Sequence, residues 1–339
     1  MPNRISSGSL IVKKVAFWIT VFAITLLSAS LSPNDCVSAE REPVNVHIPS
    51  FDISVIPFYI AKGKGYFSEE GLEPSLILAS PNVGINGLVS GNFHFSASAG
   101  SASTAIARHL PLKVVLVNTF KPAFWIYARD NIKSPLQLKG KKLAVSSLGG
   151  LSHTLARLAL KKAGLDPDRD VVMIAAGTGD IRLAALTSTA VDAAVLNAPG
   201  KFKAKKAGLN EVLFMGEQVD ALSGGIATTA GMIQTRPETV QRFVTAAVKG
   251  LKYFLANRQG SIPFMMKTMN VDMEMAREVY DMSLPTFTEG GTVGDDFMKN
   301  EVQLQAGVLG LKEVPRFDQP FDMSFALKAN QRLKNWNPQ

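Results

Sequence analysis

Small hydroxyl and glycine residues are concentrated in residues 146–152, which read Ser-Ser-Leu-Gly-Gly-Leu-Ser. Apolar residues just before this segment predict a strand, and the apolar spacing after it predicts the start of a helix. Free backbone N–H groups at a helix N-terminus attract anions and other hydrogen-bond acceptors. We therefore take Ser147, Gly149, Gly150 and Ser152 as candidate ligand-binding residues that act through backbone or hydroxyl donors.

Three further loops follow predicted strands and are also small or polar. The first contains Phe51 and Asp52, the second Gly100 and Ser101, and the third Asn197. In open α/β sheets, ligands bind beyond the carboxyl ends of the strands. Any one such loop is weak evidence, but four of them, spread over the chain, favour a cleft that they line together.

Several side chains near these loops have two possible roles. Asp52 could bind an amine of a ligand or cap the helix that follows it. Phe51 and Phe120 could form apolar walls of a pocket or pack at a connection between lobes. His153 lies in the first turn of a predicted helix, where a cationic imidazole is disfavoured. It is expected to be neutral, and it could donate one hydrogen bond to a ligand or lie in solvent.

The larger and charged residues nearby fit structural positions. Trp125 lies within a predicted strand and fits the core better than a ligand-stacking position. Lys121 and Arg129 are the nearest cations for an anionic ligand, and both also fit the surface. The loops contain no cluster of arginines that would single out a sulfonate or a phosphate. The identity and charge of a ligand therefore stay open.

Composition limits the chemistry of the chain. There is one cysteine, Cys36, and the four histidines form no metal-binding motif. If a leader is removed after Ala39, no cysteine remains, which excludes disulfides, thiolate catalysis and cysteine metal sites. We expect no cofactor and no metal. The net charge is +8, but the short lysine runs have no interleaved aromatic residues, so they predict solvated faces and no nucleic-acid binding.

The first 39 residues have the layout of a secretory signal peptide. Basic residues precede an apolar stretch at residues 15–31, and residues 37–39 form a small-x-small cleavage pattern. We expect cleavage near Ala39 and a periplasmic protein. An uncleaved membrane anchor is the alternative, because the apolar stretch is at the short limit for a membrane span.

The apolar pattern predicts an α/β fold with two lobes. Strands and helices alternate up to residue 117, and a second alternating series begins at residue 123. A strand is then predicted at residues 226–233 and a helix capping box at residues 235–238. Two crossings, near residues 120 and 224, fit a two-strand hinge. The predicted division is residues 1–39 as signal peptide, 40–120 and 225–339 as lobe 1, and 121–224 as lobe 2.

Five short motifs occur in one order along nearly the whole chain after residue 39. They resemble motifs of the solute-binding proteins of ABC importers in the nitrate/sulfonate/taurine and thiamine-pyrimidine group, also called NMT1-like. The motifs are IAKGKGYFSEEGL at residues 60–72, GLVSG at 87–91, IKSP with LKGK within 132–141, KAGLDP at 162–167 and VDAAV at 191–195.

The resemblance implies a type II periplasmic-binding-protein fold, in which two β/α lobes joined by a two-strand hinge close on a small solute. It implies a monomer that delivers a sulfonate-, taurine- or aminopyrimidine-like solute to a membrane ABC permease, without catalysis. Two alternatives stay open. One is an enzyme on the same fold that acts on a pyrimidine precursor, and the other is an envelope protein that senses a ligand.

Overall fold

The structure is a computed structural model that describes residues 40–129, 132–218 and 221–338. The predicted signal peptide, its cleavage position near Ala39 and Cys36 lie outside the described residues. None of the helices in the described ranges is long and apolar enough to cross a membrane.

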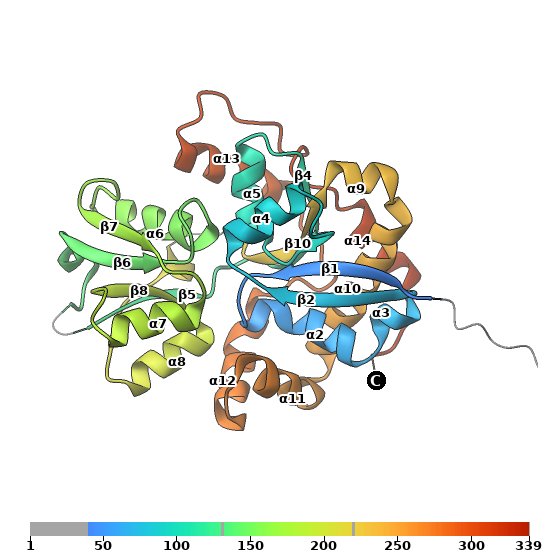
Figure 1. Cartoon of the computed structure of the whole chain (residues 1–339), viewed down its shortest axis with the longest axis horizontal. Helices are drawn as coiled ribbons and strands as arrows, with labels where there is room; N and C mark the ends of the chain where they lie inside the picture. The colour runs from blue at the N-terminus through green and yellow to red at the C-terminus, as the bar shows by residue number, and fades with distance from the viewer. Residues whose placement is uncertain (1–39, 130–131, 219–220, 339) are drawn as a thin grey trace, which may run out of the picture. The chain divides into compact units, whose positions relative to one another are not determined.

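Two five-stranded sheets organise the described chain (Figure 1). The first sheet has the strand order β2-β1-β3-β10-β4. Strand β1 pairs in parallel with β2 and β3, whereas β10 pairs antiparallel with β3 and β4. The strands are β1 Glu42–Ile48, β2 Leu72–Leu78, β3 Phe95–Ser96, β4 Leu112–Thr119 and β10 Gly224–Thr229.

The second sheet repeats this arrangement in the order β7-β6-β8-β5-β9. Strand β6 pairs in parallel with β7 and β8, and β5 pairs antiparallel with β8 and β9. In both sheets the fourth strand is antiparallel to its neighbours, and it is the first strand after the chain enters or re-enters that sheet. The strands are β5 Phe124–Ala128, β6 Lys141–Val145, β7 Val171–Ala175, β8 Ala193–Asn197 and β9 Asn210–Phe214.

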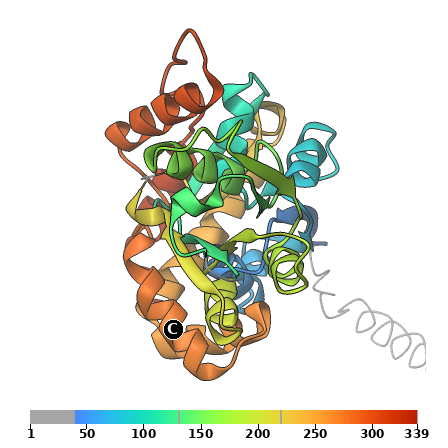
Figure 2. The ribbon, with the colours of Figure 1, turned by 90° about the vertical axis from the view of Figure 1, so that its left-hand side faces the viewer.

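Helices pack on both faces of the second sheet. Figure 1 shows α6 (Leu151–Lys162) on one face, and α7 (Gly179–Thr187) and α8 (Ala198–Lys206) on the other. Figure 2 looks onto this sheet from the side, with its green helices and strands toward the viewer. The remaining α-helices are α2 Ile56–Gly63, α3 Tyr66–Glu69, α4 Pro81–Val89, α5 Ala99–Ala107, α9 Ala230–Thr235, α10 Pro237–Ala256, α11 Arg258–Met269, α12 Met273–Ser283, α13 Asp295–Leu309 and α14 Ser324–Arg332.

The chain passes between the sheets twice. The first crossover joins β4 to β5 through residues 120–123, and the second joins β9 to β10 through residues 215–223. Antiparallel pairing of β4 with β10 continues to Thr119 opposite Gly224, and the Ser223 N–H donates to the Thr119 carbonyl at 3.2 Å. The two crossovers therefore meet the first sheet side by side.

Strand and helix periodicity account for the core. The alternate residues Val44, Val46 and Ile48 of β1 are fully buried. The 20-residue helix α10 packs Phe243 onto Phe95 of β3, with the two rings stacked and their centroids 3.8 Å apart. Burying such rings stabilises the first sheet against its longest helix.

The sequence prediction was wrong at one junction. The strand predicted for residues 226–233 ends at Thr229, because the Thr229 hydroxyl accepts from the Met232 N–H at 3.0 Å and caps α9. The capping box predicted at residues 235–238 does not form either. The Thr235 hydroxyl donates to the Gly231 carbonyl at 2.8 Å, so it closes α9 and leaves α10 without a side-chain cap.

A buried histidine links β1 to the loop that follows β2. The His47 Nε2 atom lies 3.1 Å from the carbonyl oxygen of Ala79, which can only accept, so Nε2 carries the proton. Its Nδ1 atom then accepts from the Ser96 hydroxyl at 2.7 Å. Burial lowers the pKa of His47 from 6.5 to about 4, because a charged imidazole would lose its hydration.

This gives a prediction for the pH dependence of stability. The unfolded chain takes up a proton on His47 near pH 6.5, whereas the folded chain resists it until about pH 4. The stability contributed by neutral His47 is therefore present above pH 6.5 and is lost as the pH falls toward 4. Between pH 7.5 and pH 5 we expect the free energy of unfolding to lose about 2 kcal/mol from this residue.

Urea unfolding of wild type and His47→Gln at both pH values measures this contribution. Other groups titrate in both proteins, so the difference between their pH slopes isolates His47. The exposed His109, changed to Asn to suit its positive φ, serves as the control for replacing a histidine. Equal slopes for wild type and His47→Gln would contradict the prediction.

Candidate functional site

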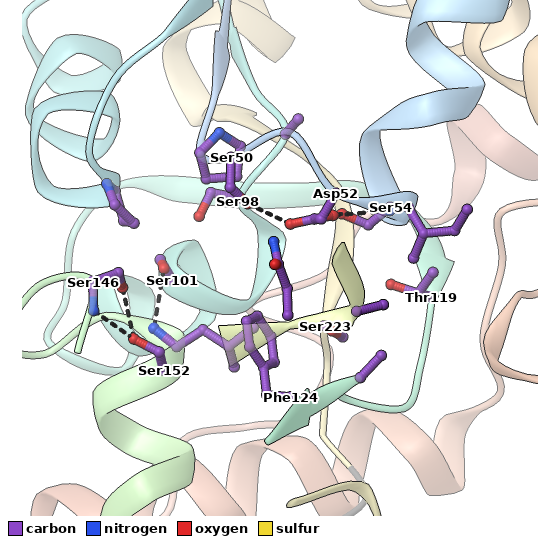
Figure 3. Close-up of a pocket in the computed structure, with 18 of the residues that line it drawn as sticks. Ser50, Asp52, Ser54, Ser98, Ser101, Thr119, Phe124, Ser146, Ser152 and Ser223 are labelled. Carbon is purple, nitrogen blue, oxygen red and sulfur yellow. Dashed lines mark hydrogen bonds between the residues drawn. The ribbon is translucent and has the colours of Figure 1, made fainter. Parts of the chain in front are cut away.

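A cleft with many hydroxyl side chains among apolar ones lies where the strand ends of both sheets and the two crossovers meet (Figure 3). It contains about 730 Å³ of space, counted out to open solvent. Residues from both sheets and both crossovers line it, and most of its polar groups are hydroxyls. These come from Ser50, Ser54, Ser98, Ser101, Thr119, Ser146, Ser152, Ser223 and Thr286.

Asp52 lies on the first-sheet side of the cleft, directly after β1. Its carboxylate accepts from the Ser54 N–H at 2.9 Å, from the Ser54 hydroxyl at 2.6 Å and from the Ser50 hydroxyl. These bonds cap the short 3-10 helix Ile53–Val55. Asp52 thus has the capping role, and the same side chain also faces the cleft.

Two helices that begin at the cleft are joined across the sheets. The Leu151 N–H, in the first turn of α6, donates to the Ser101 hydroxyl of α5 at 3.2 Å (Figure 3). Gly100 makes this approach possible. A Cβ atom at Gly100 would lie 2.5 Å from the Leu222 carbonyl oxygen and 2.9 Å from Leu151 Cδ2. The missing side chain lets α5 contact both α6 and the second crossover.

The two ends of the segment at residues 146–152 are hydrogen-bonded to each other through serine hydroxyls. The Ser152 hydroxyl accepts from the Ser146 N–H at 2.8 Å and lies 2.7 Å from the Ser146 hydroxyl. Gly149 has a φ of +79°, which favours glycine, and the Arg108 guanidinium lies beside it. The segment therefore presents Ser146, Leu151 and Ser152 to the cleft and packs its glycine bend against α5.

Four of the predicted residues in or next to this segment lie away from the cleft lining. Ser147 is 4% exposed, and its hydroxyl has no partner among the described residues. Gly150 is the N-cap of α6, and Gly149 lies at the bend. His153 accepts from the Gly149 N–H at 3.1 Å through Nδ1. Burial lowers the pKa of His153, as do the charges of nearby arginines, so the ring is neutral as expected.

The aromatic candidates also lie off the cleft. Phe51 is 36% exposed and packs edge-on against Tyr59, with ring centroids 6.3 Å apart. Phe120 packs edge-on against Phe297 at 6.5 Å. Trp125 is buried and stacks on Phe214, which agrees with a core position.

Of the predicted ligand-binding residues, Asp52, Ser101, Ser152 and Asn197 lie on the cleft. Asn197 ends β8 and caps α8 by accepting from the Gly200 N–H at 3.3 Å. The structure does not bring Phe51, Gly100, Phe120, Ser147, Gly149, Gly150 or His153 into its lining. Whether any of these residues contacts a ligand stays a prediction.

Arg182 is the important cleft residue that the sequence reasoning missed. It is 2% exposed and lines the cleft from α7. Nε donates to the Val195 carbonyl and Nη1 to the Gly177 carbonyl, each at 2.6 Å. Nη2 has no hydrogen-bond partner among the described residues. Burial lowers the pKa of Arg182 to about 10, while the carboxylates of Asp52 and Asp180 act in the opposite direction.

The Arg182 guanidinium is therefore charged at neutral pH and held rigidly by two backbone carbonyls.

The sequence contains a signal for the burial of Arg182. Arg182 and Leu186 are four residues apart, so they share one face of α7, and Leu186 is a buried core residue. Charged residues on an apolar helix face are rarely buried without a partner or a function.

The residues of the cleft could act through hydrogen bonds and charge. Across the described ranges, no three His, Cys, Asp or Glu side chains are grouped so that they could hold a metal ion. The cleft can instead offer hydroxyl donors and acceptors from both sheets, the buried Arg182 on the second-sheet side, the exposed Lys121 of the first crossover and the Asp52 carboxylate on the first-sheet side. This arrangement suits recognition of a small polar molecule.

Two sheets of the same strand order, two adjacent crossovers and a cleft between the sheets define the fold of periplasmic binding proteins. The chain belongs to the NMT1/THI5-like family, whose sequence model matches residues 52–261. The family expectation and the α/β fold class are thereby confirmed.

Individual relatives agree with this assignment. The riboflavin-binding protein RibY of Chloroflexus aurantiacus is 27% identical over 275 residues, covering 77% of this chain and 74% of that protein. The aliphatic sulphonate-binding protein SsuA of Escherichia coli superimposes with a TM-score of 0.64 at 20% identity, covering 84% of this chain and 99% of SsuA. The nitrate-binding protein NrtA of Synechocystis superimposes with a TM-score of 0.73 at 14% identity, covering 87% of this chain and 90% of NrtA.

The fold also occurs in a catalyst. The desulfurization enzyme DSZB superimposes with a TM-score of 0.65 at 16% identity, covering 86% of this chain and 99% of that enzyme. At these identities the structural likeness shows the fold alone, so function has to be argued from the cleft.

Gly100→Ala tests whether the close approach of α5 shapes the cleft. The added Cβ would overlap the Leu222 carbonyl oxygen, so α5 must shift, at a cost of about 1–3 kcal/mol in the free energy of unfolding. Gly307→Ala in α13 is the matched control, because nothing lies within 4 Å of its Cβ position. We expect a lower melting temperature for Gly100→Ala only, and equal values for both variants would contradict the close approach.

Proposed function

We propose that this chain is the extracytoplasmic solute-binding subunit of an ABC importer. It captures a small organic solute or anion between two lobes and delivers it to a membrane permease. The observation that carries the proposal is a cleft that residues of both sheets and both crossovers line. Lobe 1 comprises residues 40–120 and 225–339, and lobe 2 comprises residues 121–224.

Closure of the two lobes supplies the affinity in this proposal. A solute that contacts Asp52 and Ser101 on one side and Arg182 on the other gains all of its contacts only when the lobes are together. Such a ligand shifts the equilibrium toward the closed state by its difference in affinity for the two states. The closed state is then the form that a permease can distinguish from the empty one.

The lining favours a small polar solute with an acceptor or anionic group. The Nη2 group of Arg182 is available to such a group, and the hydroxyls can satisfy the remaining polar atoms. Phe124 is the one aromatic side chain among the described lining residues. A large flat ring system would therefore find few stacking partners, so we expect a sulfonate- or taurine-like solute to fit better than a flavin.

We propose binding without catalysis. The described lining contains serines but no histidine or cysteine, so no serine there has a neighbouring imidazole base. An envelope protein that senses a ligand would use the same cleft and differ only in its partner. Co-purification of the full chain with a membrane permease distinguishes the importer subunit from such a sensor.

Thermal unfolding with a panel of sulfonates, taurine, nitrate, aminopyrimidines and riboflavin tests the proposed function. A solute present at 100 times its Kd should stabilise the folded chain by about 2.7 kcal/mol. For an anionic solute, Arg182→Gln should weaken binding by about tenfold or more, because it removes the buried cation. Isothermal titration calorimetry measures the change in Kd.

Arg258→Gln is the control for this variant, since Arg258 forms an exposed ion pair with Asp281 and does not line the cleft. It should bind the solute like wild type. Arg182→Lys keeps the charge but loses the fork geometry, and it should give an intermediate Kd. No stabilisation by any solute would overturn the proposed function, and wild-type affinity in Arg182→Gln would overturn the role of Arg182.

A further inference from the structure

A buried carboxylate lies on α13, outside the cleft lining. Glu301 is 2% exposed. Its Oε1 accepts from the Ser103 hydroxyl at 2.8 Å and from Gln305 Nε2 at 2.9 Å, and its Oε2 accepts from the Leu222 N–H at 2.9 Å. None of these donors is charged. Burying a carboxylate is costly unless its oxygens are hydrogen-bonded, so the position needs an explanation.

The three donors come from different parts of the first lobe and from the second crossover. Ser103 lies on α5, Gln305 lies one turn further along α13, and Leu222 lies in the crossover just before β10. Gln305 extends the network by accepting from the Thr104 hydroxyl of α5 at 2.9 Å. The carboxylate thus joins α13, α5 and the crossover backbone at one point.

Both groups that Glu301 holds are adjacent to the cleft. Leu222 precedes Ser223, which lines the cleft, and its carbonyl oxygen lies against Gly100. Helix α5 carries Ser101, which accepts the hydrogen bond from α6 across the sheets. The Leu222 side chain is fully buried in an apolar cluster with Ala99 of α5 and others. The crossover end and the start of α5 are therefore fixed both by packing and by the carboxylate.

We propose that Glu301 is a positioning residue for closure, which holds the end of the second crossover and α5 together as one rigid body. In this proposal Leu222 and Ser223, which the division at residue 224 assigns to lobe 2, move with the first lobe when the lobes separate. Ser101 and Ser223 then keep their spacing and return to the same place on closure. The inference rests on the proposed solute binding.

A carboxylate suits this role better than a neutral side chain of the same shape. Its two oxygens only accept, so together they satisfy donors from α5, α13 and the crossover. The amide of glutamine would place an N–H₂ group against one of these donors. Burial raises the pKa of Glu301, whereas the hydrogen bonds from Leu222, Gln305 and Ser103 act in the opposite direction by favouring the ionised form.

Glu301→Gln tests the proposal through two measurements on the full chain. Hydrogen exchange of the solute-free protein reports directly on the Leu222 N–H, and we expect it to exchange at least tenfold faster in the variant. Stopped-flow binding of the best solute from the panel should show a dissociation rate about tenfold higher, with the association rate within about twofold. The reason is that the spacing of Ser101 and Ser223 affects the contacts made after closure, whereas encounter occurs with the open form.

Val302→Ala on the same helix is the control for general loosening. It removes buried methyl groups from the apolar cluster that also contains Leu222, but it leaves the Glu301 carboxylate and its donors in place, so it tests loss of packing alone. It should lower the melting temperature. The Leu222 N–H should then exchange faster by no larger a factor than the neighbouring amides do. Ser103→Ala removes one donor only. It should raise the Leu222 exchange rate and the solute dissociation rate, each by a smaller factor than Glu301→Gln does.

Three results would overturn the proposal. One is unchanged Leu222 exchange in Glu301→Gln, and another is equal acceleration of dissociation in Val302→Ala. If Glu301→Gln does not fold, wild-type exchange and dissociation in Ser103→Ala would overturn it. A wild-type chain that binds no solute contradicts the proposed function instead, and the exchange measurement then decides the role of Glu301 by itself.

Discussion

The antiparallel pairing of β4 with β10 is the constraint on which the cleft depends. Because the pairing runs to Thr119 opposite Gly224, both crossovers meet the first sheet at one place. The chain between them can form a complete second sheet, which stays connected at one edge only. Thr119 and Ser223 lie at this edge and line the cleft. A single crossover would leave the second sheet free to rotate in any direction, whereas two adjacent ones restrict it to bending about their shared edge.

A cation and a carboxylate line this cleft from opposite sides, Arg182 from the second sheet and Asp52 from the first. Arg182 is held by the Val195 and Gly177 carbonyls, so its guanidinium keeps one orientation, and none of the described carboxylates is in direct contact with it. Asp52 acts on it at longer range and is itself held by Ser50 and Ser54. Both charged groups are thus fixed by local bonds and are not neutralised by each other. A fixed, incompletely neutralised pair creates a field that an incoming polar molecule can experience.

Much of the fold could be predicted from the sequence, because strand and helix periodicities are strong in buried elements such as β4 and α10. The end of β10 at Thr229 could not be predicted, because the apolar pattern continues to residue 233 while the Thr229 side chain caps α9. The loops at strand ends were predicted, and Asp52, Ser101, Ser152 and Asn197 do lie on the cleft. The order of small residues within a loop could not reveal that Gly149 and Gly150 turn away. Arg182 was missed, although it shares one face of α7 with the buried Leu186.

The abundance of hydroxyls around the cleft has a consequence for how such proteins diversify. A serine hydroxyl rotates and can donate or accept, and in the Ser146–Ser152 pair either oxygen can be the donor. The lining can therefore accommodate solutes with different patterns of polar atoms without any movement of the backbone. Under the proposed solute binding, solute preference depends on the few side chains that cannot adapt in this way, above all Arg182 and Asp52. Substitutions at these positions would change the preferred solute while the two-sheet scaffold stays the same.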